Sequence, residues 1–278
     1  MNALNLGCGR RFHPDWENLD LRPVAPTIRA HDLRKGIPFP DGTFDLVYHS
    51  HVLEHFPKQA AVDFLRECHR VLRSEGVIRV AVPDLEQITR LYLEALEKAS
   101  RGVPGWRENY EWIVLEMYDQ AVRETCGGSA TEYLRQDPIP NWGFIYERCG
   151  SEAKAAIEAV RAETHSRANG NGHWRAKCEF VFRDLGRVVR NKLARAALGN
   201  EIYEAFRIGR FRRQGEVHHW MYDAYSLGQL LQRVGFCNPQ RRAAAESQVS
   251  SWAEYNLDSE PDGITYKPDS LFMEAVKP

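Results

Sequence analysis

The chain has 278 residues, of which 43% are hydrophobic and 27% are charged, the usual balance of a globular protein that can bury a full core. Its 37 Lys and Arg against 38 Asp and Glu leave a net charge of -1, so the chain as a whole has no basic field that would attract a nucleic acid. No stretch approaches the roughly 18 consecutive apolar residues of a membrane span. The six cysteines form no C-x-x-C pair, so we expect a cytoplasmic protein with reduced thiols and no zinc site.

The first twenty residues predict a site for a nucleotide-like ligand. An apolar run of strand type, Ala3 to Leu6, breaks at once into Gly7 and Gly9, and a second short strand ends at Asp20. Glycine permits positive φ and lets a ligand approach the main chain closely, and a carboxylate at this point can accept both hydroxyls of a ribose. A lone G-x-G also occurs in ordinary turns. Because Asp20 follows Gly7 so soon, with Pro14 between them, we expect the first helix to be very short or absent.

Histidines follow the strand predicted for residues 44–48. His49, His51 and His55 stand at i, i+2 and i+6 in the sequence HSHVLEH. Ligands of open α/β sheets bind at the carboxyl ends of strands, so this loop is predicted to face the reacting group. Three histidines at this spacing allow a metal site, but a general base is the stronger reading, with His51 the best candidate. For His55 we favour a structural hydrogen bond, and we expect no metal.

A long helical segment interrupts the sheet pattern. Residues 58–74 show the apolar period of a helix, and residues 77–82 read as a strand. From residue 86 to residue 215 strand patterns vanish, and this length is too great for a loop. We predict a helical lid over residues 86–215, inserted in a sheet domain formed by residues 1–85 and 216–278. Within it, residues 183–213 hold nine Lys and Arg against three Asp and Glu, which is typical of a solvated face but also fits an acidic ligand.

Seven blocks of sequence together resemble the class I methyltransferases that use S-adenosylmethionine (SAM), in particular the type 11 group. The blocks are Leu4–Gly9 (LNLGCG), Asn18–Leu21 (NLDL), His31–Leu33 (HDL), Phe39–Phe56, Cys68–Pro83, Val217–Phe236 and Ser270–Val276. The resemblance implies a Rossmann-like α/β sheet with helices on both faces, SAM as the cofactor, and a last strand that runs antiparallel at the sheet edge. The chain departs from the family where Arg11 replaces a frequent third glycine, at the methionine end of the cofactor.

The resemblance also implies roles for individual residues. The expected contacts with SAM are Leu6, Gly7, Gly9, Asp20, Leu21, Asp32, Leu33, His49 and Ser50. Among these, Asp20 would hold the ribose, and Asp32 with Leu33 would hold the adenine, although Asp32 can equally be a turn or helix-cap residue. His51 or His219 would accept a proton from the acceptor, and the family fills the histidine loop without a metal. The expected substrate contacts are His55, Tyr118, Trp142 and Tyr222, with core packing as the alternative for each of the aromatic residues.

These patterns predict an enzyme that methylates a hydroxyl, amine or carboxylate of a small molecule. Direct displacement at the sulfonium carbon needs alignment and exclusion of water more than covalent help from the protein. Two alternatives stay open: a SAM-binding protein without transferase activity, and an RNA or protein methyltransferase that uses residues 183–213. We expect no nucleic-acid partner and no membrane span, and the aromatic-rich lid allows a homodimer.

Overall fold

A seven-stranded mixed sheet forms the centre of the computed structural model, which describes residues 1–168 and 191–278. Its strands are β1 (Ala3–Leu6), β2 (Glu17–Asp20), β3 (Arg29–Ala30), β4 (Phe44–Ser50), β5 (Leu72–Pro83), β6 (Cys237–Arg242) and β7 (Ser270–Val276). The order is β3-β2-β1-β4-β5-β7-β6, and among these seven strands β7 alone runs in the direction opposite to the others. The strand order reverses between β1 and β4, which is where doubly wound folds bind ligands. The expected Rossmann-like α/β class is confirmed.

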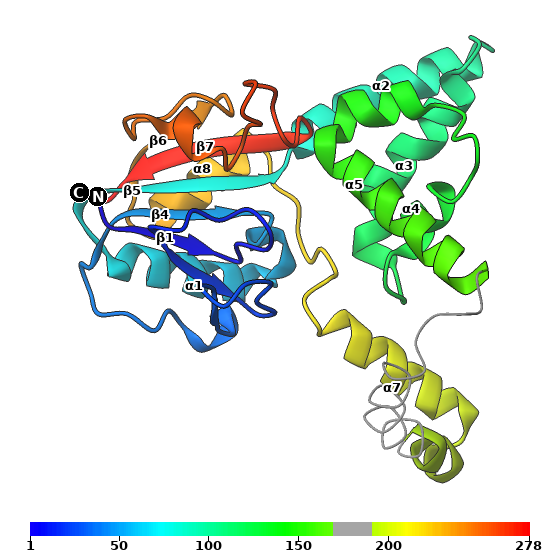
Figure 1. Ribbon diagram of the computed structural model, residues 1–278, viewed down its shortest axis with the longest axis horizontal. Coiled ribbons are helices and arrows are strands. Elements are labelled where there is room, and N and C mark those ends of the chain that lie inside the picture. Colours follow the sequence, from blue (N-terminus) through cyan, green and yellow to red (C-terminus); the bar gives the residue numbers. More distant parts are fainter. Residues whose placement is uncertain (169–190) are drawn as a thin grey trace.

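Two helices cover one face of the sheet. Helix α1 (Lys58–Val71) and helix α8 (Ala224–Arg233) pack on β1, β4, β5 and β7 and enclose the largest hydrophobic core (Figure 1). The apolar period predicted for α1 is confirmed, because its buried residues recur at three- and four-residue steps: Ala61, Phe64, Leu65, Cys68 and Val71. The helix ends earlier than predicted, since β5 begins at Leu72 and the residues before Val77 form an irregular stretch of that strand.

The opposite face is covered by a turn-rich segment, residues 243–269, with the 3₁₀ helix η3 (Trp252–Tyr255). Its Trp252 packs on Tyr48 and Trp16 in a second, smaller core. The buried Arg79 of β5 ties this segment to the sheet by donating to the carbonyl oxygens of Ala243, Ala244 and Glu246. Helices were expected on both faces, but this face is covered by loops and one short 3₁₀ helix, which the buried Arg79 ties to the sheet.

No helix lies between β1 and β2, as expected. Residues 10–16 form turns whose carbonyl groups accept hydrogen bonds from two buried amides of the strands: Asn5 donates to Arg11 at 3.0 Å, and Asn18 donates to His13 at 2.9 Å and to Trp16 at 2.7 Å. The Arg11 side chain, at the position of the family's frequent glycine, lies 3.7 Å from the ring centroid of Tyr266. This residue fastens the opening turn to the segment on the second face.

A helical part stands at the carboxyl end of β5 (Figure 1). Its helices are α2 (Leu85–Ser100), α3 (Trp106–Val122), α4 (Gly128–Tyr133), α5 (Trp142–Ala168) and α7 (Asn200–Arg212). Helices α3 to α5 share a core of their own around Trp112, Ile145 and Ile157. The described residues between 85 and 212 include no strand, which agrees with the predicted loss of the sheet pattern, and residues 191–198 are helical. Residues 183–190 of the basic stretch lie outside the described part of the chain.

The last strand agrees with the prediction in direction but not in position. β7 pairs antiparallel with β5 on one side and with β6 on the other, so β6 is the edge strand and the expected edge position of β7 is wrong. Residues of β7 are buried on both faces of the sheet, and Glu274 pairs opposite Arg79, so β7 belongs to the interior of the sheet. Within the described residues, every helix is too short or too polar to cross a bilayer.

Candidate functional site

The turn after β1 forms a cradle with Asp20. Gly7 has a φ of 65°, and a Cβ on it would lie 2.5 Å from Cγ2 of Val52, so no larger residue fits without displacing that side chain. Gly9 donates its backbone N–H to Oδ2 of Asp20 at 2.9 Å, and Arg22 donates to Oδ1 at 2.6 Å. Each carboxylate oxygen keeps a further lone pair, so Asp20 is fixed by the backbone and can still accept hydroxyl groups.

The predicted adenine-binding pair lies at the end of β3. Asp32 caps the 3₁₀ helix η1 (Leu33–Lys35), and its two carboxylate oxygens accept from Nε and Nη2 of Arg34, both at 2.8 Å. The hydrogen bonds from Arg34 lower the pKa of Asp32. The cap role is confirmed, whereas an adenine contact stays a prediction that requires Asp32 to share its carboxylate. Leu33 packs partly buried against the core.

The remaining predicted cofactor contacts differ in accessibility. Leu6 is fully buried, Leu21 is 48% exposed and Ser50 is half-buried. The His49 ring has no exposed surface and packs edge-on against Phe64 of α1, and burial lowers the pKa of His49 to about 4. A contact between the His49 side chain and the cofactor is therefore not available in this structure, and only its backbone remains for that role.

A polar pocket of about 290 Å³ opens beyond β4 and β5. Three histidines line it, namely His51, His55 and His218, and so do three carboxylates, from Glu116, Glu152 and Asp269. The loop that carries His51 continues to Val52, the residue in contact with Gly7. The pocket therefore adjoins the cradle at the carboxyl edge of the sheet, as the topology predicts for a ligand site.

Glu54 lies fully buried among the pocket histidines. Its Oε1 is 3.3 Å from Nδ1 of His51, an ion-pair contact, and 3.9 Å from Nε2 of His218, while neither carboxylate oxygen accepts a well-aligned hydrogen bond among the described residues. Burial alone would raise the pKa of Glu54, but the nearby imidazoles of His51, His218 and His55 outweigh that effect and lower it to about 2. Burial lowers the pKa of His218 to about 3. The group is thus a carboxylate surrounded by imidazoles.

The other wall of the pocket carries an excess of acid. Glu116 pairs with Arg148, and Glu152 pairs with Lys267 at 2.8 Å. Burial raises the pKa of Glu116 to about 7 and also raises the pKa of Asp269. One oxygen of Glu116 and one of Asp269 are buried without a partner among the described residues. Such acceptors suit a ligand that brings hydroxyl or amino hydrogens.

The structure brings together some of the predicted catalytic and substrate residues and separates others. His51 and His55 line the pocket, and Nδ1 of His55 also makes the expected structural hydrogen bond, to the carbonyl oxygen of Val217 at 3.2 Å. His219 is exposed and does not line the pocket, because its neighbour His218 occupies that position. Tyr222 packs in the core, 3% exposed, where burial raises its pKa to about 12.

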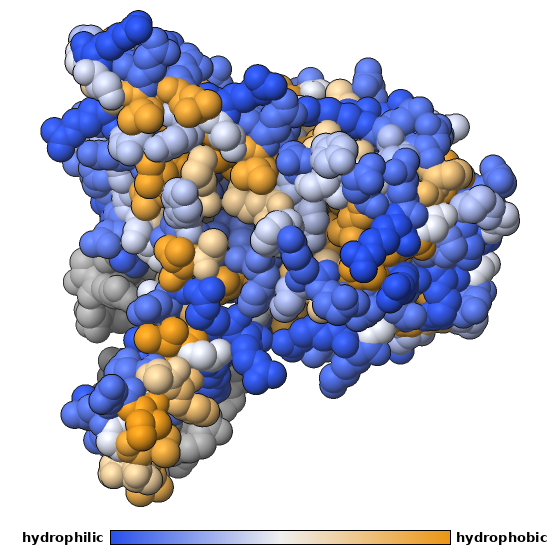
Figure 2. All heavy atoms as spheres, turned by 180° about the vertical axis from the view of Figure 1, so that it is seen from behind, coloured by the Kyte–Doolittle hydropathy of each residue, from blue (hydrophilic) through white to orange (hydrophobic). Residues whose placement is uncertain are grey.

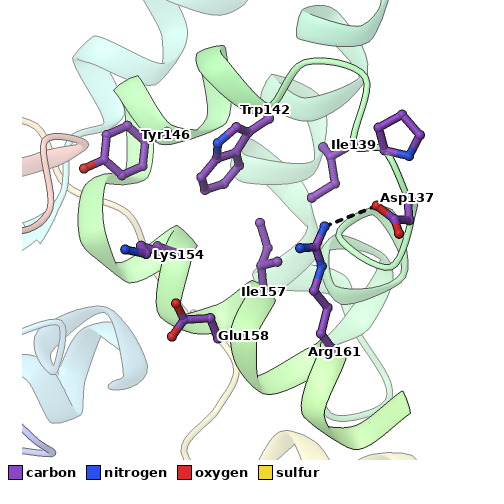
Figure 3. A pocket seen from close by; sticks show the side chains of 9 residues that line it. Asp137, Ile139, Trp142, Tyr146, Lys154, Ile157, Glu158 and Arg161 are labelled. Atoms are coloured by element: carbon purple, nitrogen blue, oxygen red, sulfur yellow. Dashed lines mark hydrogen bonds and ion pairs between the residues drawn. The ribbon is translucent and has the colours of Figure 1, made fainter. Parts of the chain in front are cut away.

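The two aromatic residues predicted from the lid lie elsewhere. Tyr118 is 56% exposed on α3. Trp142 lines a separate open hollow of about 570 Å³ on the helical part, where Figure 3 shows it beside Tyr146 and Lys154 and across from Arg161. Neither side chain lines the polar pocket, so their substrate contacts stay predictions that this pocket does not support.

Sequence reasoning missed the residues that define the pocket. Glu54 had a usable signal, because it follows His51 by three residues in the same loop, and His218 stands beside the predicted His219. Glu116 and Asp269 had none, since each is a single acid in an otherwise ordinary segment. Only the packing of α3 and the segment before β7 brings these acids to the histidines.

Comparison with known proteins supports a methyltransferase domain in this chain. A family model described as a methyltransferase domain matches residues 12–80, which include Asp20 but not Gly7 or Gly9. This match and two curated relatives support a class I SAM-dependent methyltransferase. A probable SAM-dependent methyltransferase of Mycolicibacterium smegmatis is 30% identical to it over 30% of this chain and 38% of its own length. A probable SAM-dependent methyltransferase of Mycobacterium tuberculosis (strain H37Rv) is 44% identical over 17% of each chain.

The similarity of the methyltransferase domain does not extend over whole proteins. The chain spans well under half the length of these two curated relatives. A solved SAM-dependent methyltransferase from Archaeoglobus fulgidus aligns over 99% of this chain and 86% of its own, at 11% identity and a TM-score of 0.38. SAM is the cofactor of the family, and the residues of the cradle fit an adenosyl group because Gly9 has open space where a side chain would stand and Asp20 offers free acceptor positions.

Proposed function

We propose that this chain transfers the methyl group of SAM to a hydroxyl, amine or carboxylate of a small molecule. The observation that carries the proposal is the contact between the cradle and the pocket. Val52, in the loop that holds the pocket histidines, packs directly on Gly7, in the turn that holds Asp20. A cofactor in the cradle and an acceptor in the pocket would therefore meet across one loop.

The chain would act mainly by placing the two reactants. SAM supplies an activated methyl group on a positive sulfur, so alignment and exclusion of water are the protein's tasks. Gly9 would open the backbone to the cofactor, Gly7 makes room for Val52 beneath it, and Asp20 would hold the ribose. His51, which reaches the pocket and hydrogen-bonds through Nε2 to Oγ of Ser270 at 2.8 Å, is the side chain we propose beside the acceptor. His219 stays a second candidate from the sequence alone.

The charge of the pocket favours a small molecule over RNA. Among the described residues, the cations at the pocket are Lys267, which pairs with Glu152, and Arg148 beside it, which pairs with Glu116, so neither is free to bind an anionic phosphate backbone. None of the described residues of the stretch 183–213 lines this pocket, although Arg212 at the end of α7 donates to the carbonyl oxygen of Ala121, next to the lining residue Gln120. The small-molecule reading therefore stands ahead of the RNA alternative.

We propose that residues 86–215 form a lid on the domain made of residues 1–85 and 216–278. Contacts already join the two parts near the pocket: His218 donates its backbone N–H to Gln120 of α3 at 3.0 Å, and Gly127 donates to Glu216 at 2.8 Å. A cover at this place would keep water from the reacting groups.

Calorimetric titration with SAM and with its demethylated product tests the cofactor assignment. Replacing Asp20 by Ala should weaken binding by about 1–3 kcal/mol, the scale of an unmatched buried polar group. Asp15, an acid of the same turn whose side chain is 86% exposed, provides the matched control, and Asp15→Ala should bind as the wild type does. Equal affinity of the wild type and Asp20→Ala would refute the ribose assignment. Tight binding without transfer of labelled methyl to any acceptor would favour a SAM-binding protein instead.

A further inference from the structure

The polar pocket has a ligand set for a metal ion at its base. Glu54, His55 and His218 each place one ligand atom within 4.8 Å of the other two. Both oxygens of Glu54 are buried and lack a hydrogen-bond partner among the described residues. We infer that Glu54, His55 and His218 bind a first-row divalent metal ion, such as Zn²⁺, Fe²⁺ or Co²⁺, with an open coordination position facing the pocket.

The hydrogen bonding of His55 leaves the correct nitrogen free. Nδ1 of His55 lies 3.2 Å from the carbonyl oxygen of Val217, and because a carbonyl only accepts, Nδ1 must carry the hydrogen. Nε2 of His55 therefore keeps its lone pair in the neutral ring. A second ring nitrogen that donates to a carbonyl oxygen is the usual support of a metal-binding histidine, because it fixes the tautomer and the ring orientation.

Backbone hydrogen bonds hold the two ligand segments together. The carbonyl oxygen of Glu54 accepts from the N–H groups of His219, at 2.7 Å, and Trp220, at 3.3 Å. The N–H of His218 donates to the carbonyl oxygen of Gln120 at 3.0 Å. The position of His218 opposite Glu54 and His55 is thus set by the main chain, which is the kind of pre-organisation that a metal site needs.

The chemistry of the set selects among metals. Two imidazole nitrogens and one carboxylate oxygen suit first-row transition ions and zinc, whereas Mg²⁺ and Ca²⁺ prefer oxygen ligands throughout. A buried carboxylate that accepts no well-aligned hydrogen bond, as Glu54 is among the described residues, raises the free energy of the folded state. A divalent cation would supply the opposite charge. Metal bonds of about 2.0–2.2 Å would require the three side chains to draw closer together. His51, whose Nδ1 is 3.3 Å from Oε1 of Glu54, borders the open side.

The expectation of no metal was argued from His49, His51 and His55, which belong to one loop. His49 is buried away from the pocket, and the ligand that completes the set, His218, comes from a distant segment that only the fold brings near. A bound ion would hold an oxygen atom of the acceptor beside the cofactor. This role rests on the proposed methyl transfer, whereas the metal site itself does not.

Metal uptake by the full chain, prepared without a histidine tag, tests the inference. The chain is stripped with a chelator, dialysed against Zn²⁺ or Co²⁺, and measured by elemental analysis and calorimetry, with the visible absorption of Co²⁺ as a report of the ligand geometry. We expect one equivalent of metal per chain. Glu54→Gln and His218→Gln should each weaken binding at least about 10-fold to 100-fold, since loss of even a supporting residue has that effect.

A control histidine distinguishes metal binding at this site from nonspecific binding to other histidines. His69 lies on α1, where its ring packs on Phe236, and His69→Gln should bind metal as the wild type does. Equal uptake by all four proteins, or no uptake by the folded wild type, would overturn the inference. Thermal melting shows whether each variant is folded. If Glu54→Gln does not fold, the comparison is made with His218→Gln. SAM binding by the stripped protein is measured separately, so a failed metal site leaves the methyltransferase proposal standing.

Discussion

Arg79 of β5 and Glu274 of β7 face each other in the sheet register, with Nη1 of the guanidinium 2.9 Å from Oε1 of the carboxylate, and neither side chain has any exposed surface. The same guanidinium lies 2.7 Å from Oδ2 of Asp258, and Trp252 stacks on it at 4.4 Å. Glu274 in turn accepts from Arg242, Ser247 and Gln248. One buried cation and two buried acids thereby hold the segment that covers the second face of the sheet.

Removing Arg79 should destabilise the protein strongly. Arg79→Met leaves the buried Asp258 without its cation and Glu274 with Arg242 alone, and breaking a buried pair in this way costs about 3–5 kcal/mol. Arg73, an exposed arginine of the same strand that pairs with Asp45, provides the control, and Arg73→Ala should change the free energy of unfolding by less than about 1 kcal/mol. Urea unfolding of both variants measures the difference. Similar losses in the two would show that the buried network contributes no more than a surface pair.

The junction between the helical part and the sheet should be sensitive to a single methyl group. Gly150 interrupts α5 with a φ of 60° and a ψ of -144°, and a Cβ there would lie 2.5 Å from the carbonyl oxygen of Tyr266. Gly150→Ala should therefore lower the melting temperature and expose the junction to limited proteolysis, because both the backbone and the contact are strained. Gly143, near the start of α5 with open space around it, is the control. Gly143→Ala should be neutral or stabilising by up to about 1 kcal/mol, and an unchanged Gly150→Ala would show that the junction yields easily.

The ion pair between Glu67 and Arg70 should make stability depend on acidity. Glu67 accepts from Nε and Nη2 of Arg70, both at 2.8 Å, and from the N–H of Ile37 at 2.9 Å. The hydrogen bonds from Arg70 lower the pKa of Glu67 below its ordinary 4.5. A carboxyl group whose pKa is lower in the folded state stabilises the fold above the unfolded pKa, and this contribution is lost as the pH falls through the folded value.

The matching variant is Glu67→Gln, compared with the wild type at several pH values. At neutral pH the wild type should be more stable by about 1 kcal/mol, since the pair is partly exposed. The difference should shrink below about pH 4.5, where the unfolded carboxyl begins to keep its proton. Denaturant titrations at each pH give the free energies of unfolding, and a constant difference across the range would assign the effect to shape and not to charge.

Local sequence determined the parts of this protein that short-range physics controls. Gly7, Gly9 and Asp20 predicted the turn and its carboxylate, because positive φ and the end of a strand depend on residues that are close in sequence. The spacing of Ala61, Phe64 and Leu65 predicted α1. The predicted end of α1 lay too late in the chain. Gly76 resembles a residue that ends a helix, but it lies in the irregular start of β5. There its Cβ would press on the carbonyl oxygen of Arg73 at 2.8 Å.

Tertiary structure alone decided which distant polar groups meet. Glu54 and His218 come together through backbone hydrogen bonds between two loops, and Glu116 and Asp269 join them only when α3 packs beside the segment before β7. The apolar residues around Arg79 and Glu274 in the sequence indicate that both lie in strands, but they do not indicate that the two side chains pair. The sequence thus determined the glycine turn and the carboxylate beside it, while the pocket proposed for the acceptor follows from long-range packing. Charge and hydrogen-bond complementarity depend on position in space and not on spacing along the chain.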